Sequence, residues 1–218
     1  MTRAIVFDLD GTLIDSLPDI AAAANALLAD HGLAPLPERQ IGGFVGMGER
    51  VFLDRLISAT ALDPLSYDAL LAQFIAHYKL CTGLTRVFPG VLETLAQLRA
   101  DGLVLGICTN KPGGPLDAVL DAVDLRRHFD VVIAGDTLSL RKPDPAPLRL
   151  AFERLGATHG VYVGDSDVDA ATALAAHVPF VLYTEGIRSK PVEHIPHDRA
   201  FRRFSDLYGL CKDVMRAI

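Results

Sequence analysis

The sequence predicts an α/β fold: a Rossmann-like open parallel sheet with helices on both faces, and a small helical cap domain inserted after the first strand. Short apolar segments alternate with amphipathic helical segments along most of the chain, and this alternation is typical of a parallel sheet whose faces are both covered by helices. Residues 15–85 interrupt the alternation, because they contain helical patterns and no convincing strand. Acidic residues follow two of the apolar segments, which indicates chemistry at one edge of the sheet.

Length, charge and cysteine content limit the possible classes of protein. The chain has 218 residues, enough for a core domain with a smaller inserted one. A net charge of −6 argues against nucleic acid or an anionic membrane as the main partner. Three cysteines without a Cys-x-x-Cys pair favour reduced thiols over a disulfide framework or a zinc site. The sequence shows neither a signal-peptide pattern nor an apolar segment of membrane-spanning length, so we expect a soluble, cytoplasmic protein, monomeric or homodimeric.

The strands are predicted from short segments that are apolar throughout. Residues 4–7 form the first such segment and end at the polar residues 8–12. An unbroken apolar segment is typical of a strand that is buried on both faces, as in a parallel sheet. Four later segments have the same character and complete the predicted sheet: residues 103–108, 131–134, 161–163 and 180–183.

Helices are expected between and after these strands. The first begins at Pro89-Gly90, carries Val91, Leu95 and Leu98 on one face, and stops at Gly102, so it has both a start and a stop signal. The other helices of the core are expected over residues 115–123, 146–155 and 167–177, and from about residue 205 onward.

Residues 15–85 are predicted to form a helical cap domain, and residues 1–14 and 86–218 the α/β core. Three apolar stripes at helical spacing begin near Ile20, Val51 and Leu70. An insertion after the first strand sits over the crevice where open α/β sheets bind ligands, so these helices are placed to cover a site. The alternative is an extra helical layer with no mobility, and the sequence leaves it open.

Asp8 and Asp10 directly follow the first predicted strand. Their spacing lets the two side chains share a face while the chain is extended, and two carboxylates held that close require a positive partner. A hard divalent cation with oxygen ligands, most plausibly Mg²⁺, is the usual solution. The alternative is a turn in which the aspartates only make local hydrogen bonds, and Asp10-Gly11 alone does not decide between the two.

A second transition from strand to acidic residues occurs near the end of the predicted sheet. Asp165 directly follows residues 161–163 and the glycine after them, and Asp169 lies at the start of the next helix. The carboxyl ends of parallel strands share one edge, so Asp165 is expected to meet Asp8 and Asp10 there. Acids that complement a helix N-terminus explain Asp167 well and Asp165 poorly.

Phosphate-binding groups are expected at the same edge. The strand over residues 103–108 ends at Thr109-Asn110-Lys111, where a hydroxyl and exposed backbone N–H groups can receive phosphate oxygens. Lys142, in a later loop, is placed to neutralise Asp8 and a bound phosphate together. An isolated lysine is more often a solvated surface residue, and only its place in this series favours a functional role.

These motifs resemble those of the haloacid dehalogenase (HAD) superfamily, and within it the bacterial phosphoglycolate phosphatase branch. The four segments that carry the resemblance stand in the family's order: Val6-Phe7-Asp8-Leu9-Asp10-Gly11-Thr12, Thr109-Asn110-Lys111-Pro112, Lys142-Pro143 and Gly164-Asp165-Ser166-x-x-Asp169. Asp15-Ser16 and residues 85–91 also resemble that branch. Each motif alone is a modest signal, but four in order at strand ends are a strong one.

The resemblance implies the catalytic roles of five residues in a phosphoric monoester hydrolase. Asp8 attacks phosphorus and forms an aspartyl-phosphate, and Asp10 protonates the leaving alcohol and then deprotonates the hydrolytic water. Thr109 and the Asn110 backbone bind the phosphoryl group, and Lys142 steadies Asp8 and the phosphate. These roles agree with the physics of phosphoryl transfer, in which positioning and electrostatics do most of the work.

The resemblance also implies a metal site and a substrate. Asp8, the Asp10 carbonyl and Asp165 would bind Mg²⁺, with Asp169 as a supporting residue. The substrate implied is 2-phosphoglycolate, a small phosphorylated metabolite of carbohydrate metabolism, and Arg50 is a candidate contact for its carboxylate. A surface arginine in the first turn of a helix is at least as good an interpretation of Arg50. His177 departs from the branch, which usually has glycine after the fourth-motif helix.

Two alternatives remain open on the sequence. The first is a β-phosphoglucomutase-like enzyme or a sugar-phosphate phosphatase, which has the same catalytic edge and a similar cap. The second is a non-catalytic receiver-like module, which also gathers aspartates, a threonine and a lysine at a sheet edge. The length of the chain and the Asp8-x-Asp10-Gly-Thr order argue against the module.

Overall fold

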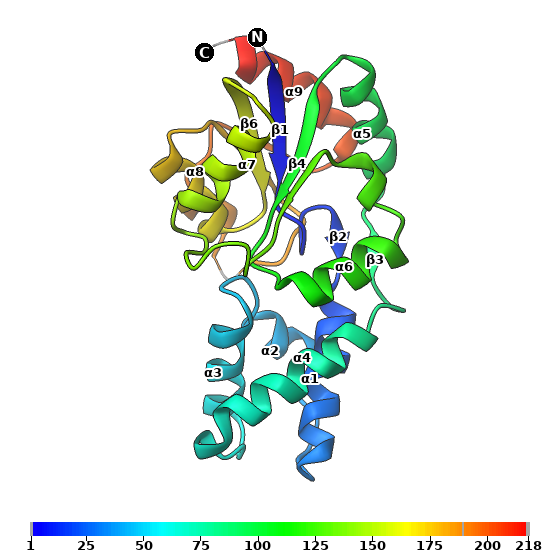
Figure 1. Ribbon diagram of the computed structural model, residues 1–218, viewed down its shortest axis with the longest axis vertical. Coiled ribbons are helices and arrows are strands. Elements are labelled where there is room, and N and C mark those ends of the chain that lie inside the picture. The colour runs from blue at the N-terminus through cyan, green and yellow to red at the C-terminus, as the bar shows by residue number, and fades with distance from the viewer. Residues whose placement is uncertain (1, 189, 217–218) are drawn as a thin grey trace.

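In the computed structural model, which describes residues 2–188 and 190–216, a six-stranded parallel sheet forms the centre of the core (Figure 1). Its strands lie in the order β5-β4-β1-β6-β7-β8. This arrangement confirms the predicted α/β fold. The strand bounds are β1 (Arg3–Phe7), β4 (Val104–Cys108), β5 (Val131–Ile133), β6 (His159–Gly164), β7 (Phe180–Tyr183) and β8 (Arg199–Phe201).

Helices cover both faces of this sheet, as the uniformly apolar strands require. Along β1, Ile5 and Phe7 pack on one face and Ala4 and Val6 on the other, and all four are fully buried. The first face is covered by α5 (Val91–Ala100), α6 (Gly113–Ala122) and α9 (Phe204–Arg216), and the second by α7 (Ala146–Arg154) and α8 (Asp167–Ala176).

The inserted helices form a separate layer with an apolar core of their own. Figure 1 shows them beyond the carboxyl ends of the strands, at the opposite end of the molecule from both chain termini. Buried side chains such as Leu27, Leu53 and Phe74 meet in a cluster that contains no residue of the sheet. The elements of this layer are α1 (Leu17–Asp30), α2 (Glu38–Gly42), α3 (Glu49–Ala59), the 3₁₀ turn η1 (Pro64–Ser66) and α4 (Tyr67–Leu80).

Several short elements were not expected from the sequence. The pair β2 (Ile14–Asp15) and β3 (Arg86–Val87) is antiparallel and joins the two chain segments that lead into and out of the helical layer. The edge strand β8 has a single buried residue, Phe201, and so lacks an apolar pattern. Two further 3₁₀ turns are η2 (Arg126–His128) and η3 (Val192–His194), and the latter lies in residues 190–197, a segment rich in proline and histidine.

His177 ends α8 in a left-handed conformation, with φ of 61°. This conformation explains why glycine is usual there, because a residue with a Cβ atom is disfavoured in it by about 1 kcal/mol. The helix nevertheless stops where the sequence predicts, since the His177 N–H donates to the Leu174 carbonyl. Among the described residues, no helix combines the length and apolar character that a membrane crossing requires.

The two chain segments that connect the layers are held together by Asp19, a buried acid in the first turn of α1. One carboxylate oxygen accepts hydrogen bonds from the Thr85 N–H and the Thr85 hydroxyl, both at 2.6 Å. The other accepts from the Leu84 N–H at 3.1 Å. Because Asp19 and Thr85 are both buried, these hydrogen bonds fix the return segment against the start of α1.

We predict that Asp19→Ala lowers the free energy of unfolding by about 2–3 kcal/mol, because buried donors lose their acceptor. Urea denaturation followed by circular dichroism measures this change. Asp213→Ala is the matched control, since Asp213 is an exposed acid of α9 whose nearest cation, Arg216, is 3.7 Å away. A loss in Asp19→Ala no larger than in the control would show that the buried hydrogen bonds contribute little.

Candidate active site

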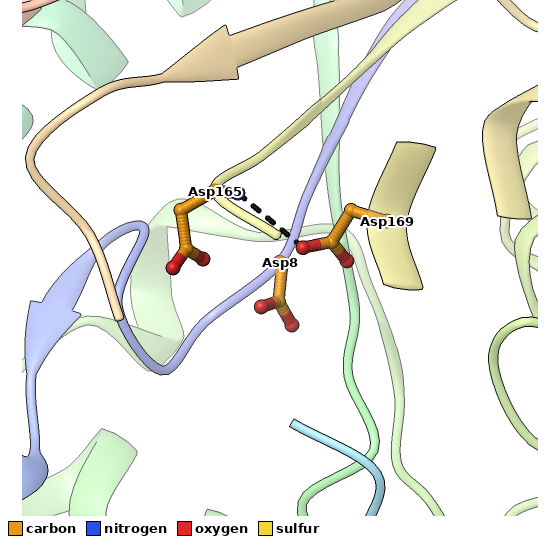
Figure 2. Close-up of side chains that lie close together, drawn as sticks. All are labelled: Asp8, Asp165 and Asp169. Atoms are coloured by element: carbon orange, nitrogen blue, oxygen red, sulfur yellow. Dashed lines mark hydrogen bonds between the residues drawn. The ribbon is translucent and has the colours of Figure 1, made fainter. Parts of the chain in front are cut away.

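The predicted acids and the phosphate-binding segment meet at the carboxyl edge of the sheet. Asp8, Thr109 and Asp165 directly follow β1, β4 and β6. Because β1 pairs with β4 on one side and with β6 on the other, these three strand ends lie side by side. Asp169 comes from the first turn of α8 and faces the same point, as Figure 2 shows.

Lys142 is the central cation of this edge and is almost fully buried. Its ammonium donates to Asp8 Oδ1 at 2.8 Å, to Asp169 Oδ1 at 2.7 Å and to the Tyr162 hydroxyl at 2.9 Å. These contacts use all three N–H groups of a lysine. Burial by itself lowers the pKa of an ammonium, but the Asp169 and Asp8 charges outweigh it and raise the pKa of Lys142.

Asp8 lies in a balance of opposing charges. Burial raises the pKa of Asp8 to about 7, the neighbouring Lys142 ammonium opposes that rise, and the Asp169 carboxylate adds to it. The Lys142 bond uses Oδ1, while Oδ2 accepts no hydrogen bond from any described residue. Asp8 therefore has one oxygen held in place and one available for a metal ion or for an electrophile.

Asp165 also presents an unused carboxylate oxygen. Its Oδ1 accepts from the Thr12 hydroxyl at 2.7 Å, whereas the buried Oδ2 finds no donor within the described part of the chain. Burial, followed by the Asp169 and Asp8 charges, raises the pKa of Asp165 well above its usual range. A Cβ atom at Gly11, where φ is 85°, would lie 2.5 Å from this oxygen, so a glycine keeps the space beside it open.

Asp169 supports the site from behind. Its Oδ1 accepts from Lys142 and from Tyr162, and its Oδ2 accepts from the Ser166 hydroxyl at 2.6 Å and from the backbone N–H of Asp165 at 3.3 Å. Although burial raises a carboxyl pKa, the charge of Lys142 and these hydrogen bonds hold the pKa of Asp169 below its usual value.

The donor set fits a hard divalent cation. Oxygen atoms of Asp8, Asp165 and Asp169 lie within 4.8 Å of one another, and carboxylates this close and buried are stabilised by a bound cation. The uncommitted oxygens belong to Asp8 and Asp165, while both oxygens of Asp169 are already occupied. The chemistry of these residues therefore suits Mg²⁺, with two direct ligands and one supporting acid.

Asp10 points toward the inserted helices rather than into the carboxylate cluster. Its Oδ1 accepts from the Ser16 hydroxyl at 2.6 Å and from the Lys111 ammonium at 3.0 Å. Asp10 lines the same cavity as Asp8 but is not part of the cluster that Asp8 forms with Asp165 and Asp169. This separation suits an acid or base that acts on a different atom from the one that Asp8 reaches.

Thr109 and Asn110 occupy the third side of the site. Both are buried and line the cavity. The Thr109 hydroxyl accepts from the Lys111 N–H at 3.1 Å, which orients it at the end of β4. The Asn110 side chain connects two loops, because it donates to the carbonyls of Lys142 at 2.9 Å and Gly46 at 3.1 Å.

The inserted helices close the cavity opposite the sheet. The described residues of this layer that line it include Glu49, Phe52, Phe74 and Tyr78. Glu49 forms a two-pronged ion pair with Arg141, at 2.6 and 2.7 Å, and so joins α3 to the loop that carries Lys142. Sequence reasoning missed Tyr78 as a site residue, since its spacing marked it only as a member of an apolar stripe.

The structure favours one of the two interpretations of Arg50 and adds a residue to which sequence reasoning assigned no role. Arg50 is exposed and does not line the cavity, and its carbonyl accepts from the Tyr67 hydroxyl at 3.0 Å. Lys111, which received no separate role, is buried and lines the cavity beside Asp10. Its position directly after Thr109-Asn110 at a strand end was the available signal.

Known proteins resemble this chain over nearly its full length. A model of the haloacid dehalogenase-like hydrolase family matches residues 2–177. A phosphoglycolate phosphatase of Cereibacter sphaeroides is 44% identical over 97% of this chain and 98% of its own length. One from Rhodospirillum rubrum is 42% identical over 95% of this chain and 90% of its own. The crystal structure of a predicted phosphoglycolate phosphatase from Haemophilus somnus superposes with a TM-score of 0.90 at 30% identity, covering 96% of this chain and 97% of the other.

The family match includes every residue of the acidic edge, from Asp8 after β1 to Asp169 in α8. It also favours an enzyme over the receiver-like module, because the matching family consists of hydrolases. The chain belongs to the haloacid dehalogenase-like hydrolase family.

Proposed function

We propose that this protein is a Mg²⁺-dependent phosphomonoester hydrolase that works through an aspartyl-phosphate on Asp8, with 2-phosphoglycolate as its substrate. The observation that carries the proposal is the state of Asp8, which lines the cavity, has one oxygen held by Lys142, and has a second that accepts no hydrogen bond from a described residue. The choice of 2-phosphoglycolate as substrate is supported by the relatives named phosphoglycolate phosphatase, which are 44% identical over 97% of this chain.

In the first step, a carboxylate oxygen of Asp8 attacks the phosphorus atom of the ester. The new bond joins Asp8 to the phosphoryl group, and the bond between phosphorus and the ester oxygen breaks with its electron pair going to that oxygen. Asp10 donates a proton to the leaving oxygen, so the alcohol departs neutral. Lys142 holds Asp8 in position throughout, because its ammonium also binds Asp169 and Tyr162.

In the second step, water attacks the phosphorus atom of the aspartyl-phosphate. Asp10, now a carboxylate, takes one proton from that water, and the bond between phosphorus and Asp8 breaks to release inorganic phosphate. The carboxylate of Asp8 is restored and Asp10 is protonated again. One acid therefore serves both steps, and Asp10 lines the same cavity as Asp8.

The remaining residues position the phosphoryl group. Asp8, Asp165 and the Asp10 carbonyl would hold Mg²⁺, which supplies positive charge against the phosphoryl oxygens, and Asp169 would support them. Thr109 and the Asn110 backbone would bind the phosphoryl oxygens from the other side. We assign residues 15–85 as a cap domain over the leaving group, since cap side chains such as Phe74 and Tyr78 line the cavity.

We predict that Asp8→Asn lowers the Mg²⁺-dependent release of phosphate from p-nitrophenyl phosphate at least about a thousandfold, because an amide does not act as the nucleophile. Exposed Asp213→Asn is the matched control. Wild-type protein quenched during turnover should carry phosphate on the peptide that contains Asp8, as detected by mass spectrometry. Normal turnover in Asp8→Asn would rule out the covalent route.

We predict that Mg²⁺ raises the thermal midpoint of the wild-type protein and raises that of Asp165→Asn much less. Binding to the folded state stabilises it, and the variant lacks one of the two uncommitted carboxylates. Without metal, the variant should be at least as stable as wild type, because a buried like charge has been removed. Calorimetry with and without EDTA measures both effects. An equal Mg²⁺ response in the two proteins would place the ion elsewhere.

We predict that kcat/KM for 2-phosphoglycolate exceeds that for hexose phosphates and nucleoside monophosphates by at least about tenfold, equivalent to about 1.4 kcal/mol of transition-state binding. The comparison is made with one enzyme preparation at saturating Mg²⁺. A preference for a sugar phosphate would transfer the assignment to the sugar-phosphate phosphatase alternative and leave the mechanism on Asp8 intact.

A further inference from the structure

Lys111 is a buried cation in the cavity to which the proposed chemistry gives no role. Its side chain is 1% exposed, and its ammonium lies 3.0 Å from Asp10 Oδ1. The same ammonium is hydrogen-bonded to the hydroxyl of Tyr78, which belongs to α4 of the inserted layer, and lies 4.1 Å from the centre of the Tyr78 ring. Lys111 therefore joins the core to the cap at the side of Asp10.

Two hydrogen-bond donors remain uncommitted at this junction. An ammonium has three N–H groups. One of those of Lys111 points between the two oxygens of Asp10, which lie at 3.0 and 3.4 Å, and a second is donated to Tyr78, so the third has no acceptor among the described residues. The Tyr78 hydroxyl accepts from Lys111, and no described residue accepts the proton of that hydroxyl. Both residues line the cavity, so one free donor comes from the core and one from the cap.

Lys111 differs in this respect from the other basic side chains near the site. Lys142 has all three donors committed to Asp8, Asp169 and Tyr162. Arg141 is held by its two-pronged ion pair with Glu49 and does not line the cavity. Among the described residues that line the cavity, Lys111 is the cation with a donor to spare.

The position of Lys111 determines which part of a substrate it can meet. Under the proposed function, Asp10 lies within hydrogen-bond reach, about 2.6–3.2 Å, of the leaving oxygen. The Lys111 ammonium is a direct neighbour of the Asp10 carboxylate, and so faces the atoms attached to that oxygen. A carboxylate one carbon removed from the ester oxygen would fall in this region and would accept both free donors at once.

We propose that Lys111 and Tyr78 form a carboxylate subsite that selects phosphate esters of 2-hydroxycarboxylic acids. Lys111 supplies the charge and one hydrogen bond, and Tyr78 supplies a second hydrogen bond from the cap. The inference rests on the proposed function, because the role of Asp10 locates the leaving group. It assigns to Lys111 and Tyr78 the contact that the sequence had suggested for Arg50, which is exposed.

The test compares 2-phosphoglycolate with its neutral isostere, in which a carboxamide replaces the carboxylate. The measured quantity is the ratio of kcat/KM for the acid to kcat/KM for the amide. We expect Lys111→Met to lower this ratio about 10- to 100-fold, Lys111→Arg to retain part of it, and Tyr78→Phe to lower it about fivefold. Lys79→Met, an exposed lysine of α4 beside Tyr78, is the matched control and should leave the ratio unchanged.

The ratio of kcat/KM for the acid to that for the amide separates recognition of the carboxylate from a structural or acid–base effect of the substitution. Loss of Asp10 positioning or of folding in Lys111→Met would slow both esters equally, and an unchanged ratio in Lys111→Met and Tyr78→Phe would overturn the subsite. If wild-type protein hydrolyses neither ester in Mg²⁺, the proposed function fails by itself. In that case the binding of the two esters to wild type and to Lys111→Met is measured by calorimetry. The subsite is supported if the variant loses the preference for the acid over the amide, and it is overturned if that preference persists.

Discussion

The site depends on one electrostatic constraint: three carboxylates are buried around a single ammonium at the carboxyl edge of the sheet. Asp8 and Asp169 share Lys142, while Asp165 keeps a buried oxygen without a donor. Buried like charges raise one another's pKa and destabilise the fold unless a cation compensates. The arrangement therefore favours a further positive charge, which the proposed divalent cation would supply.

The sheet topology brings these charges together. Strand β1 lies at the centre of the six-stranded order, with β4 on one side and β6 on the other, so residues far apart in the sequence become direct neighbours. Because the strands are parallel, every loop at this edge faces the same way. The apolar contacts of both sheet faces hold the strand ends rigidly, and this rigidity lets hydrogen bonds of 2.7 and 2.8 Å to Lys142 persist in a crowded acidic site.

Local patterns predicted the sheet and the acidic edge because the residues that form each of them are contiguous in the sequence. The strand at Phe180–Tyr183 is uniformly apolar, and Asp8 and Asp165 each follow such a strand directly. The edge strand β8 could not be predicted, because only Phe201 among its residues is buried. The contact between Tyr78 and Lys111 was equally hidden, since it depends on how α4 of the cap packs over the end of β4, and Tyr78 has the spacing of an ordinary core residue.

The two buried lysines have different neighbours: Lys142 contacts the core, whereas Lys111 contacts both the core and the cap. Within the described part of the chain, Lys142 binds groups of the core, with one donor each to Asp8, Asp169 and Tyr162, so its contact with Asp8 does not involve the cap. Lys111 is shared between the core acid Asp10 and the cap residue Tyr78, so its surroundings change when the cap sequence changes. Under the proposed function, a substitution in α4 would therefore alter which leaving group is accepted while Asp8 and Lys142 stay in place. Under the proposed function, this separation leaves the phosphate chemistry to the core and the choice of leaving group to the cap.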